Sequence, residues 1–409
     1  MDLIDQVYVE KTDREKLYQA AMTGMVESLD RYSSYIPPEE FTQFQNIITQ
    51  EFGGLGIIID GPPQSEKLVI VTPLYGTPAY DAGLEPGDAI VSIDSKTTAG
   101  LDISAVSQML RGPEGSAVRL EIEREGQPEK LTFEVKRAAI ELESVVGDRR
   151  NLNARWSFSL ESDPRIGYFR INTFGEKTVN ELRAALATVK SDMKAVILDL
   201  RDNAGGLLTS AAEICDMFLN DGTIVTTRGR DGVLYEEIKA KPGTEVDNSV
   251  PIVVIINDES ASASEIVAAC LKDRGRAAIV GQRSFGKGSV QNVVELDSGR
   301  SGLKLTTAKY YPPSGRNIHR TTESKPEDVW GVQPDEGLEI TLDDTQRRAV
   351  FQQWRDRSDP RKSKQIPEYQ PTVAPNEESE TTSNVIPETD PQLERAMQYL
   401  KGKLDATKP

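Results

Sequence analysis

The chain contains one histidine, His319, and two cysteines, Cys215 and Cys270, among its 409 residues. This shortage practically excludes a zinc site built from histidine and cysteine, and we expect neither a metal nor a cofactor. Both cysteines lie in apolar, helix-like stretches, "AAEICDMFL" and "EIVAACLKD", so we expect buried free thiols. A chain with one histidine also has little choice of the usual activating base for a serine nucleophile.

Long apolar runs are missing as well, since no stretch approaches the roughly 20 residues that span a bilayer. The start, "MDLIDQVYVEKTD", has neither the basic nor the apolar region of a signal peptide. We therefore expect either a cytosolic protein or a chain that begins after a removed segment. Basic residues are outnumbered, with 48 Lys and Arg against 65 Asp and Glu and a net charge of -17. This balance argues against nucleic acid or an anionic membrane as partner, because both need concentrated positive charge.

Four stretches of the chain differ in pattern. Residues 1–50 place apolar side chains at helical spacing and predict an N-terminal helical region. Residues 51–138 are short β-type runs separated by turns, which predict a small β-rich domain. Residues 139–345 alternate apolar strands ("RIGYFRI", "KAVILDL", "PIVVIIN") with amphipathic helices, which indicates an α/β fold with a mixed, largely parallel sheet. Residues 346–409 are expected to form a disordered linker and a short helix, because Pro, Glu, Ser and Thr dominate after about residue 358.

The stretch "DESASASEIV" joins a strand-like run to a helix-like run. Ser262 and Glu265 fit the capping-box pattern, with serine at the N-cap and glutamate three residues later. A serine at such a junction also lies where the helix N–H groups and dipole can stabilise an oxyanion. The residues alone leave both interpretations open, a helix cap or a nucleophile.

Lys287, in "GQRSFGKGSVQNV", lies between two glycines. It is either a solvated lysine in a turn or a base, because a lysine desolvated in a cleft can be neutral and activate serine. Gln291 can orient such a lysine, since its side-chain oxygen accepts a hydrogen bond. Ser284 and Lys287 also match the S-x-x-K motif of penicillin-binding enzymes, but Gly286 disfavours the helix that this motif needs. His319 lies in a polar loop, and we do not expect it to be catalytic.

A third stretch, "AVILDLRDNAGGLL", ends an expected strand and continues into Gly205 and Gly206. Ligand crevices form at the carboxyl ends of strands in α/β sheets, and glycine lets the backbone approach a ligand closely. The functional interpretation is an oxyanion donor from these amides. The alternative is a plain strand-to-helix turn.

Together, "NDESASASEIVAACLKD", "VGQRSFGKGSVQ", "LDLRDNAGG" and "LTTAKYYPPSGRNI" resemble the carboxyl-terminal processing, or tail-specific, proteases over roughly residues 1–345. The resemblance implies a crotonase-like core and a serine endopeptidase with Ser262 as nucleophile, Lys287 as base and Gln291 as its orienter. The oxyanion-hole residues that it implies are Gly205, Gly206 and Ala263. The chain departs from the family at His319, where many members have an uncharged polar residue, and after residue 358.

The same family carries a PDZ domain, and "FGGLGIII" and "GTPAYDAGLEPGDAIVSIDSKTT" are similar to PDZ sequences. The resemblance implies that this domain captures the free C-termini of protein or peptide substrates through backbone amides and an added strand. It also implies a homodimer and export to the periplasm or cell envelope. The alternative function is a catalytically silent PDZ scaffold that binds C-termini. The implied peptide-binding residues are Gly54, Leu55, Gly56, Ile57 and Arg111, the last matching an arginine that couples the PDZ domain to the protease.

Overall fold

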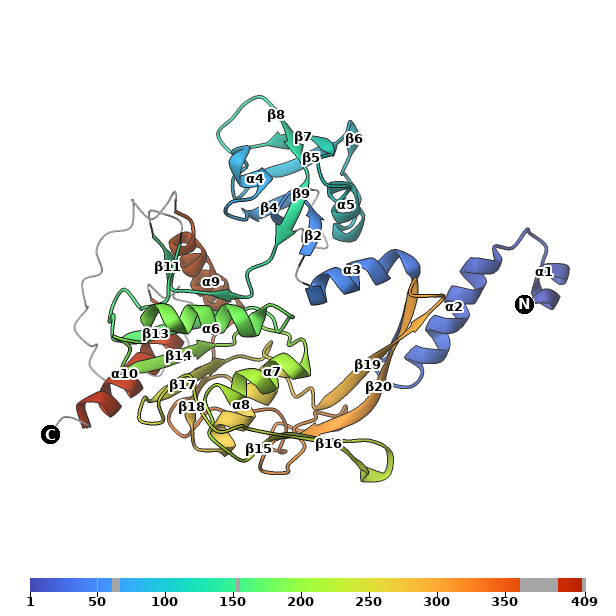
Figure 1. Ribbon diagram of the computed structural model, residues 1–409. Coiled ribbons are helices and arrows are strands. Elements are labelled where there is room, and N and C mark those ends of the chain that lie inside the picture. Colours follow the sequence, from blue (N-terminus) through green and yellow to red (C-terminus); the bar gives the residue numbers. More distant parts are fainter. Residues whose placement is uncertain (50, 61–66, 152–154, 361–388, 407–409) are drawn as a thin grey trace. The chain divides into compact units, whose positions relative to one another are not determined.

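The computed structural model describes residues 1–49, 51–60, 67–151, 155–360 and 389–406. The chain divides into two compact units, each with its own core. The larger unit combines residues 1–48 with residues 143–409, and the smaller unit is residues 49–142 (Figure 1).

The centre of the larger unit is a sheet of strand order β10-β13-β14-β17-β18. The last four of these strands are parallel, whereas β10 pairs antiparallel with β13 at the edge. The central strands are largely apolar, as strands buried on both faces usually are, and Arg170 of β13 and Asp199 of β14 are charged exceptions. The predicted mixed, largely parallel sheet is therefore confirmed. The strands are β10 (Val145–Val146), β13 (Ile166–Ile171), β14 (Ala195–Asp199), β17 (Ile252–Ile256) and β18 (Ala277–Gly281).

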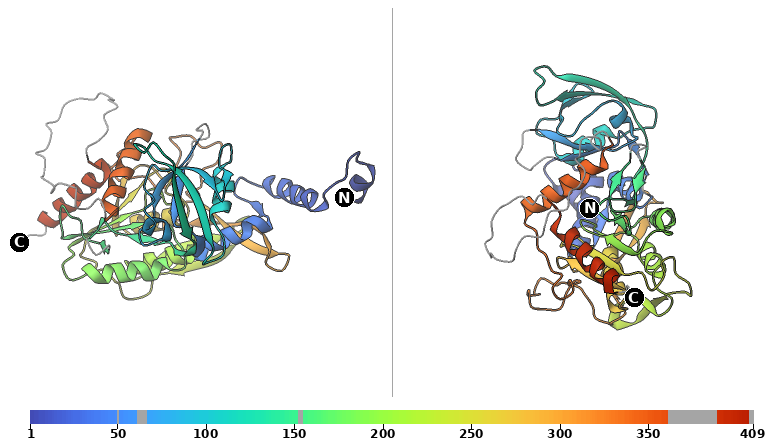
Figure 2. Two further views of the ribbon diagram at one scale, coloured as in Figure 1. Left: turned by 90° about the horizontal axis from the view of Figure 1, so that it is seen from above. Right: turned by 90° about the vertical axis from the view of Figure 1, so that its left-hand side faces the viewer.

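Helices cover both faces of this sheet (Figures 1 and 2). Because side chains alternate along a strand, Phe169 and Leu198 pack with α6, α7 and α8, whereas Tyr168 and Ile197 pack with α10. Helix α10 contributes buried Leu393 and further apolar side chains along the same face. The helices are α6 (Thr178–Val189), α7 (Leu208–Asp216), α8 (Ala263–Asp273) and α10 (Pro391–Ala406).

A second sheet in the larger unit is antiparallel, with order β1-β20-β15-β16 and with β19 on the other side of β20. Strands β19 and β20 form a long ribbon, orange in Figure 1. Strand β1, which the sequence did not predict, carries the N-terminal region onto β20 by pairing Ser34 with Lys304. The strands are β1 (Ser34–Ile36), β15 (Thr223–Arg228), β16 (Leu234–Lys239), β19 (Ser289–Leu296) and β20 (Ser301–Tyr311). The N-terminal helices are α1 (Asp2–Val7), α2 (Arg14–Glu27) and α3 (Pro38–Thr49).

The linker predicted from residue 346 is wrong at its start, because α9 (Asp344–Ser358) occupies these residues. Asp343 caps this helix and accepts a 2.8 Å hydrogen bond from the Gln346 N–H, while Gln346 accepts one from the Asp343 N–H. Trp354 of α9 stacks on Trp156 of β12 (Trp156–Ser157), which pairs with β11 (Arg149–Arg150). Residues 361–388, the main part of the predicted disordered segment, lie outside the described residues.

The smaller unit is built on a sheet of order β3-β4-β5-β7-β8, with β6 paired to β5 and a separate pair formed by β2 and β9. Strand β3 lies at an edge of this sheet. In the described residues of the whole chain, no helix is long and apolar enough to cross a membrane. The elements are β2 (Glu51–Gly54), β3 (Ile57–Asp60), β4 (Leu68–Pro73), α4 (Pro78–Asp81), β5 (Ala89–Ile93), β6 (Lys96–Thr97), α5 (Ile103–Leu110), β7 (Ala117–Glu123), β8 (Leu131–Lys136) and β9 (Ala138–Glu141).

Candidate active site

Ser262 lies between the end of β17 and the first residue of α8, as the N-cap of that helix. Its backbone has φ 56° and ψ -112°, a conformation that residues with a side chain rarely adopt. The Ser262 N–H donates to Glu265 Oε2 at 2.9 Å, and its carbonyl accepts from the Ile266 N–H at 3.0 Å. Nucleophilic serines of known hydrolases also occupy strained turns between a strand and a helix.

A cavity of about 840 Å³ in the larger unit brings most of the predicted catalytic residues together. Its wall includes Ser262, Lys287, Gln291 and Gly206, which lie up to 85 residues apart in the chain. A large pocket with apolar walls and a few polar groups is the usual form of a ligand site. The apolar part of the wall includes Phe174, Leu207, Leu208, Ile266, Val290 and Tyr310.

Lys287 follows Gly286, whose φ is +87°, in the loop between β18 and β19. Because this loop is not helical, Ser284 and Lys287 cannot form the S-x-x-K arrangement. Lys287 is half-buried, and burial lowers its pKa, with a further decrease from Lys304. In the described residues, its ammonium makes no hydrogen bond with Ser262 or Gln291, and it lies 5.4 Å from the centre of the Tyr32 ring.

The carboxylate of Glu265 connects the turn of Ser262 to the loop of Lys287. Glu265 is fully buried and accepts the N–H groups of Ser262 at 2.9 Å, Gly286 at 2.7 Å and Lys287 at 2.8 Å. It also accepts the Ser284 hydroxyl at 2.5 Å. Burial raises the pKa of Glu265, and these hydrogen bonds oppose that increase. The capping motif predicted the bond to Ser262 but gave no sign of the other contacts.

The turn after β14 offers one of its two glycine amides to the cavity. The Gly205 N–H is already donated to Asn203 Oδ1 at 2.8 Å, so it is not available as an oxyanion donor. The Gly206 and Ala263 N–H groups have no hydrogen-bond acceptor in the described part of the chain, and Gly206 lines the cavity. A Cβ on Gly205 would lie 2.7 Å from the Ser262 Cβ, which explains the need for glycine at this close approach.

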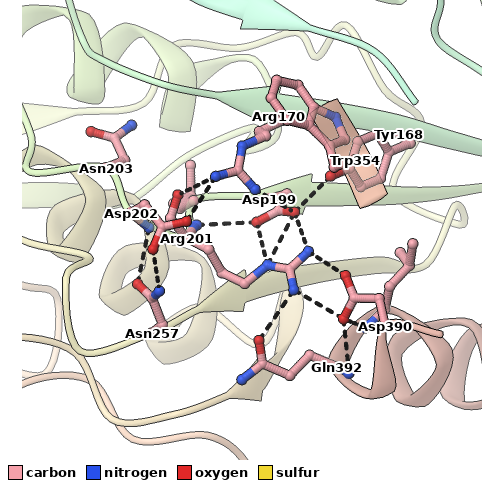
Figure 3. Close-up of polar contacts among 12 residues, drawn as sticks. Tyr168, Arg170, Asp199, Arg201, Asp202, Asn203, Asn257, Trp354, Asp390 and Gln392 are labelled. Atoms are coloured by element: carbon pink, nitrogen blue, oxygen red, sulfur yellow. Dashed lines mark hydrogen bonds and ion pairs between the residues drawn. The ribbon is translucent and has the colours of Figure 1, made fainter. Parts of the chain in front are cut away.

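A buried cluster of charges lies at the end of β14, behind this turn (Figure 3). Asp199 accepts from Arg201 at 2.6 Å, from Arg170 at 3.4 Å and from the Tyr168 hydroxyl at 2.6 Å. Burial opposes ionisation, but Arg201 and then Arg170 hold the pKa of Asp199 well below its usual range. Arg201 also contacts Asp390 at 2.8 Å, so the cluster anchors the start of α10. In the sequence, Asp199 and Arg201 belong only to the end of an expected strand, "AVILDLRDNAGGLL", and give no sign of this anchor.

Four of the five peptide-binding residues predicted in the smaller unit, residues 54–57, lie between the end of β2 and the start of β3. Gly54 ends β2 and Ile57 begins β3, which is an edge strand of its sheet. Leu55 is buried, and Gly56 has a φ of +76° with its carbonyl accepting from the Leu74 N–H. Arg111 is the C-cap of α5, and its N–H donates to the Ser107 carbonyl at 3.1 Å.

The remaining candidates contribute no second site. His319 does not line the cavity, and burial, then Lys309 and Arg31, lower its pKa. Cys215 and Cys270 are buried free thiols, as predicted. The described residues contain no group of three His, Cys, Asp or Glu side chains that could hold a metal ion.

Comparisons with known proteins agree with the division into two units. The model of peptidase family S41 matches residues 165–338, and a PDZ domain model matches residues 69–124. The carboxy-terminal-processing protease of Bartonella bacilliformis is 40% identical over 326 residues, covering 78% of this chain and 71% of the relative. The carboxy-terminal processing protease CtpB of Bacillus subtilis is 36% identical over 322 residues, covering 78% of this chain but 64% of the relative. Among solved structures, the photosystem II D1 C-terminal processing protease is 28% identical with a TM-score of 0.48, covering 82% of this chain and 84% of that one.

Proposed function

Because the chain belongs to peptidase family S41, the carboxy-terminal processing serine proteases, we propose that it is an endopeptidase with a Ser262–Lys287 catalytic dyad. The observation that carries the proposal is the shared cavity: Ser262 at a strained turn and a half-buried Lys287 line the same wall. Lys287 can act as a base because burial lowers its pKa and favours the neutral amine.

In this mechanism, neutral Lys287 takes the proton of the Ser262 hydroxyl as Oγ attacks the substrate carbonyl carbon. The carbonyl oxygen becomes an oxyanion, for which the free Gly206 and Ala263 amides are the candidate donors. Lys287 then gives its proton to the leaving amine, and an acyl-enzyme remains on Ser262. Water, deprotonated by the same lysine, hydrolyses that ester and restores the serine.

Gln291 is proposed as the residue that orients Lys287. Its Nε2 donates to the Ser289 hydroxyl at 2.9 Å and to the Thr306 hydroxyl at 3.3 Å. Both hydrogens of the amide are therefore used, and Oε1 remains as the acceptor for the lysine.

The smaller unit is proposed to select substrates by their free C-termini. The edge position of β3 and the preceding glycine turn support this function, since a peptide can add a strand there and place its carboxylate at backbone amides. Homodimerisation and a location in the periplasm or cell envelope are proposed from the family alone. The relatives are bacterial and chloroplastic processing proteases.

The decisive experiment labels the protein with a fluorophosphonate probe and identifies the modified residue. We expect label on Ser262, and no labelling or cleavage of an unfolded protein substrate by Ser262→Ala. The loss of the N-cap side chain should cost about 0.5–2 kcal/mol, so this variant should stay folded. Lys287→Ala and Lys287→Arg should both be inactive, because a guanidinium stays protonated at working pH.

His319→Ala is the matched control for the base, and we expect it to cleave at nearly the wild-type rate. Cleavage by Ser262→Ala would refute the assignment of the nucleophile. If wild-type protein neither reacts with the probe nor cleaves, but binds free C-termini, the silent PDZ scaffold is the correct function.

A further inference from the structure

The turn "DRYS", at residues 30–33 just before β1, is held together by the carboxylate of Asp30. Asp30 Oδ1 accepts the N–H groups of Tyr32 at 2.7 Å and Ser33 at 2.9 Å, and Oδ2 accepts the Ser33 hydroxyl at 2.7 Å. Burial opposes its ionisation, but the hydrogen bonds from Ser33 and Tyr32 lower the pKa of Asp30. The side chain is therefore a carboxylate that can only accept hydrogen bonds.

Thr306 of β20 connects this turn to the candidate active site. Its N–H donates to the Ser33 hydroxyl at 3.0 Å, and its own hydroxyl donates to Asp30 Oδ1 at 3.2 Å. The same Thr306 hydroxyl accepts from Gln291 Nε2 at 3.3 Å, across the register of β19 and β20. A continuous series of hydrogen bonds thus runs from Gln291 through Thr306 to Asp30.

The direction of this series is fixed by its last member. Because Asp30 can only accept, the Thr306 hydroxyl must donate to it and is left with lone pairs for Gln291. Gln291 must then present its NH₂ group to Thr306 and keep Oε1 for another partner. A rotated amide would instead direct two N–H donors toward Lys287, which is also a donor when protonated.

We propose that Asp30 is a positioning residue for Gln291, acting through the Thr306 hydroxyl to fix the amide with its oxygen available to Lys287. The inference rests on the proposed Ser-Lys-Gln site and extends it to the N-terminal region, outside the residues matched by the S41 model. The same turn also places the centre of the Tyr32 ring 5.4 Å from the Lys287 ammonium. The turn therefore lies against the proposed base, Lys287, and is connected through Thr306 to Gln291. The N-terminal region thereby completes the catalytic site.

Thr306→Val tests the proposal, because it removes the hydroxyl while keeping the shape of the side chain. We expect kcat to fall by between about 10- and 100-fold with KM little changed, since small losses of alignment have effects of that size. Asp30→Asn should lower kcat less than Thr306→Val does, because the two backbone N–H groups keep the amide oxygen at the Oδ1 position, where it still accepts from Thr306. Thr223→Val is the control. Thr223 lies on β15 of the same sheet, away from the cavity, and its hydroxyl donates a hydrogen bond to Glu237. All variants should keep the thermal unfolding midpoint within a few degrees.

A double-mutant cycle with Gln291→Ala separates positioning from a general structural role. If Thr306 acts through Gln291, the double variant Thr306→Val/Gln291→Ala will be no slower than Gln291→Ala alone. Losses that multiply would overturn the proposal. Gln291→Ala with full activity would overturn it as well, but would leave the dyad standing if Ser262→Ala and Lys287→Ala are inactive. A Ser262→Ala variant that still cleaves would refute the proposed function itself.

The pH profile supplies a readout that simple destabilisation does not change. An amide oxygen near Lys287 favours its charged form, so its removal should lower the pKa of Lys287. The midpoint of the rising limb of kcat/KM should move to lower pH by the same amount in Thr306→Val and Gln291→Ala. Lys304 and Glu265, the charged groups that act on Lys287, are unchanged in both variants. Equal midpoints in Thr306→Val and wild type would contradict the proposal.

Discussion

Lys304 is a second lysine in the cavity of Ser262 and Lys287. It is half-buried on β20 and has no ion pair or side-chain hydrogen bond in the described residues. After burial, its charge is the largest contribution that lowers the pKa of Lys287. In a chain of net charge -17, this local positive charge favours the neutral base at the site that needs it.

Removing this charge should move the pH dependence of the enzyme. In Lys304→Gln the pKa of Lys287 rises, so a smaller fraction of the base is neutral at pH 7. We expect lower kcat/KM at pH 7 and a rising limb displaced to higher pH, with the plateau at high pH preserved. Lys272→Gln, whose lysine pairs with Asp335 at 3.0 Å, is the control and should leave the midpoint unchanged. A midpoint that stays in place in Lys304→Gln would show that Lys304 does not act on Lys287.

The site residues that were predicted have local signals in the sequence, whereas residues with distant partners were not predicted. Ser262, Lys287, Gln291 and Gly206 were predicted from motifs and resemblance, and the structure places them in one cavity. Asp30 has no such signal, because its contact with Thr306 crosses 276 positions of the chain. Only the folded structure shows that the Asn203 side chain accepts the Gly205 N–H, or that the Glu265 carboxylate accepts the Lys287 N–H.

At the level of helices and strands, prediction succeeded where burial imposes a pattern. The central strands were predicted because they are buried on both faces and therefore read as continuous apolar runs. Strand β1 was missed, since three residues give no periodicity. Helix α9 was missed because its sequence, DTQRRAVFQQWRDRS, contains few apolar residues and precedes the Pro-, Glu-, Ser- and Thr-rich stretch from which the linker was predicted. Helix α10 was predicted as an end helix, yet it belongs to the core.

A test of α10 as a core element compares a buried leucine with an exposed one. Leu400 is 0% exposed against the sheet, so Leu400→Ala should lower the free energy of unfolding by roughly 2–5 kcal/mol. Leu3 of α1 is 72% exposed, and Leu3→Ala should change it by less than about 0.5 kcal/mol. Urea unfolding measures both. A cost below about 1 kcal/mol for Leu400→Ala would show that α10 is not part of the folded core.

For the molecule as a whole, the proposed function assigns recognition and chemistry to two units with separate cores. The protease core is interrupted after residue 48 and resumes at residue 143, so the smaller unit is an insertion between the N-terminal turn and the catalytic sheet. The proposed function requires that this insertion reads the free end of the substrate while the larger unit cuts. An enzyme that works this way must distinguish substrates by their last carboxylate.

Two substrates that differ only in a C-terminal amide should therefore be cleaved at different rates. Amidation removes a carboxylate that backbone amides would hold, and each donor left unpaired costs roughly 1–3 kcal/mol. We expect kcat/KM for the free acid to be higher by about tenfold or more. Gly56→Ala should reduce the preference, because its φ is +76° and a Cβ would meet Thr77 at 2.3 Å. Gly126→Ala, at φ +78° in an open turn, is the control; equal rates for acid and amide by wild-type protein would exclude tail recognition.

The order of the chain places α10 after every proposed catalytic residue. When the ribosome has made every catalytic residue, one face of the parallel sheet, including Tyr168 and Ile197, still lacks its cover. Arg201 likewise lacks its ion pair with Asp390 at that stage. A message truncated after residue 360 would encode the whole dyad and both glycines of the turn, but its product would expose an apolar sheet surface of the kind that chaperones bind and quality-control proteases degrade. Synthesis of α10 thus becomes a condition for a stable protease fold, and termination before α10 leaves a chain that quality control removes.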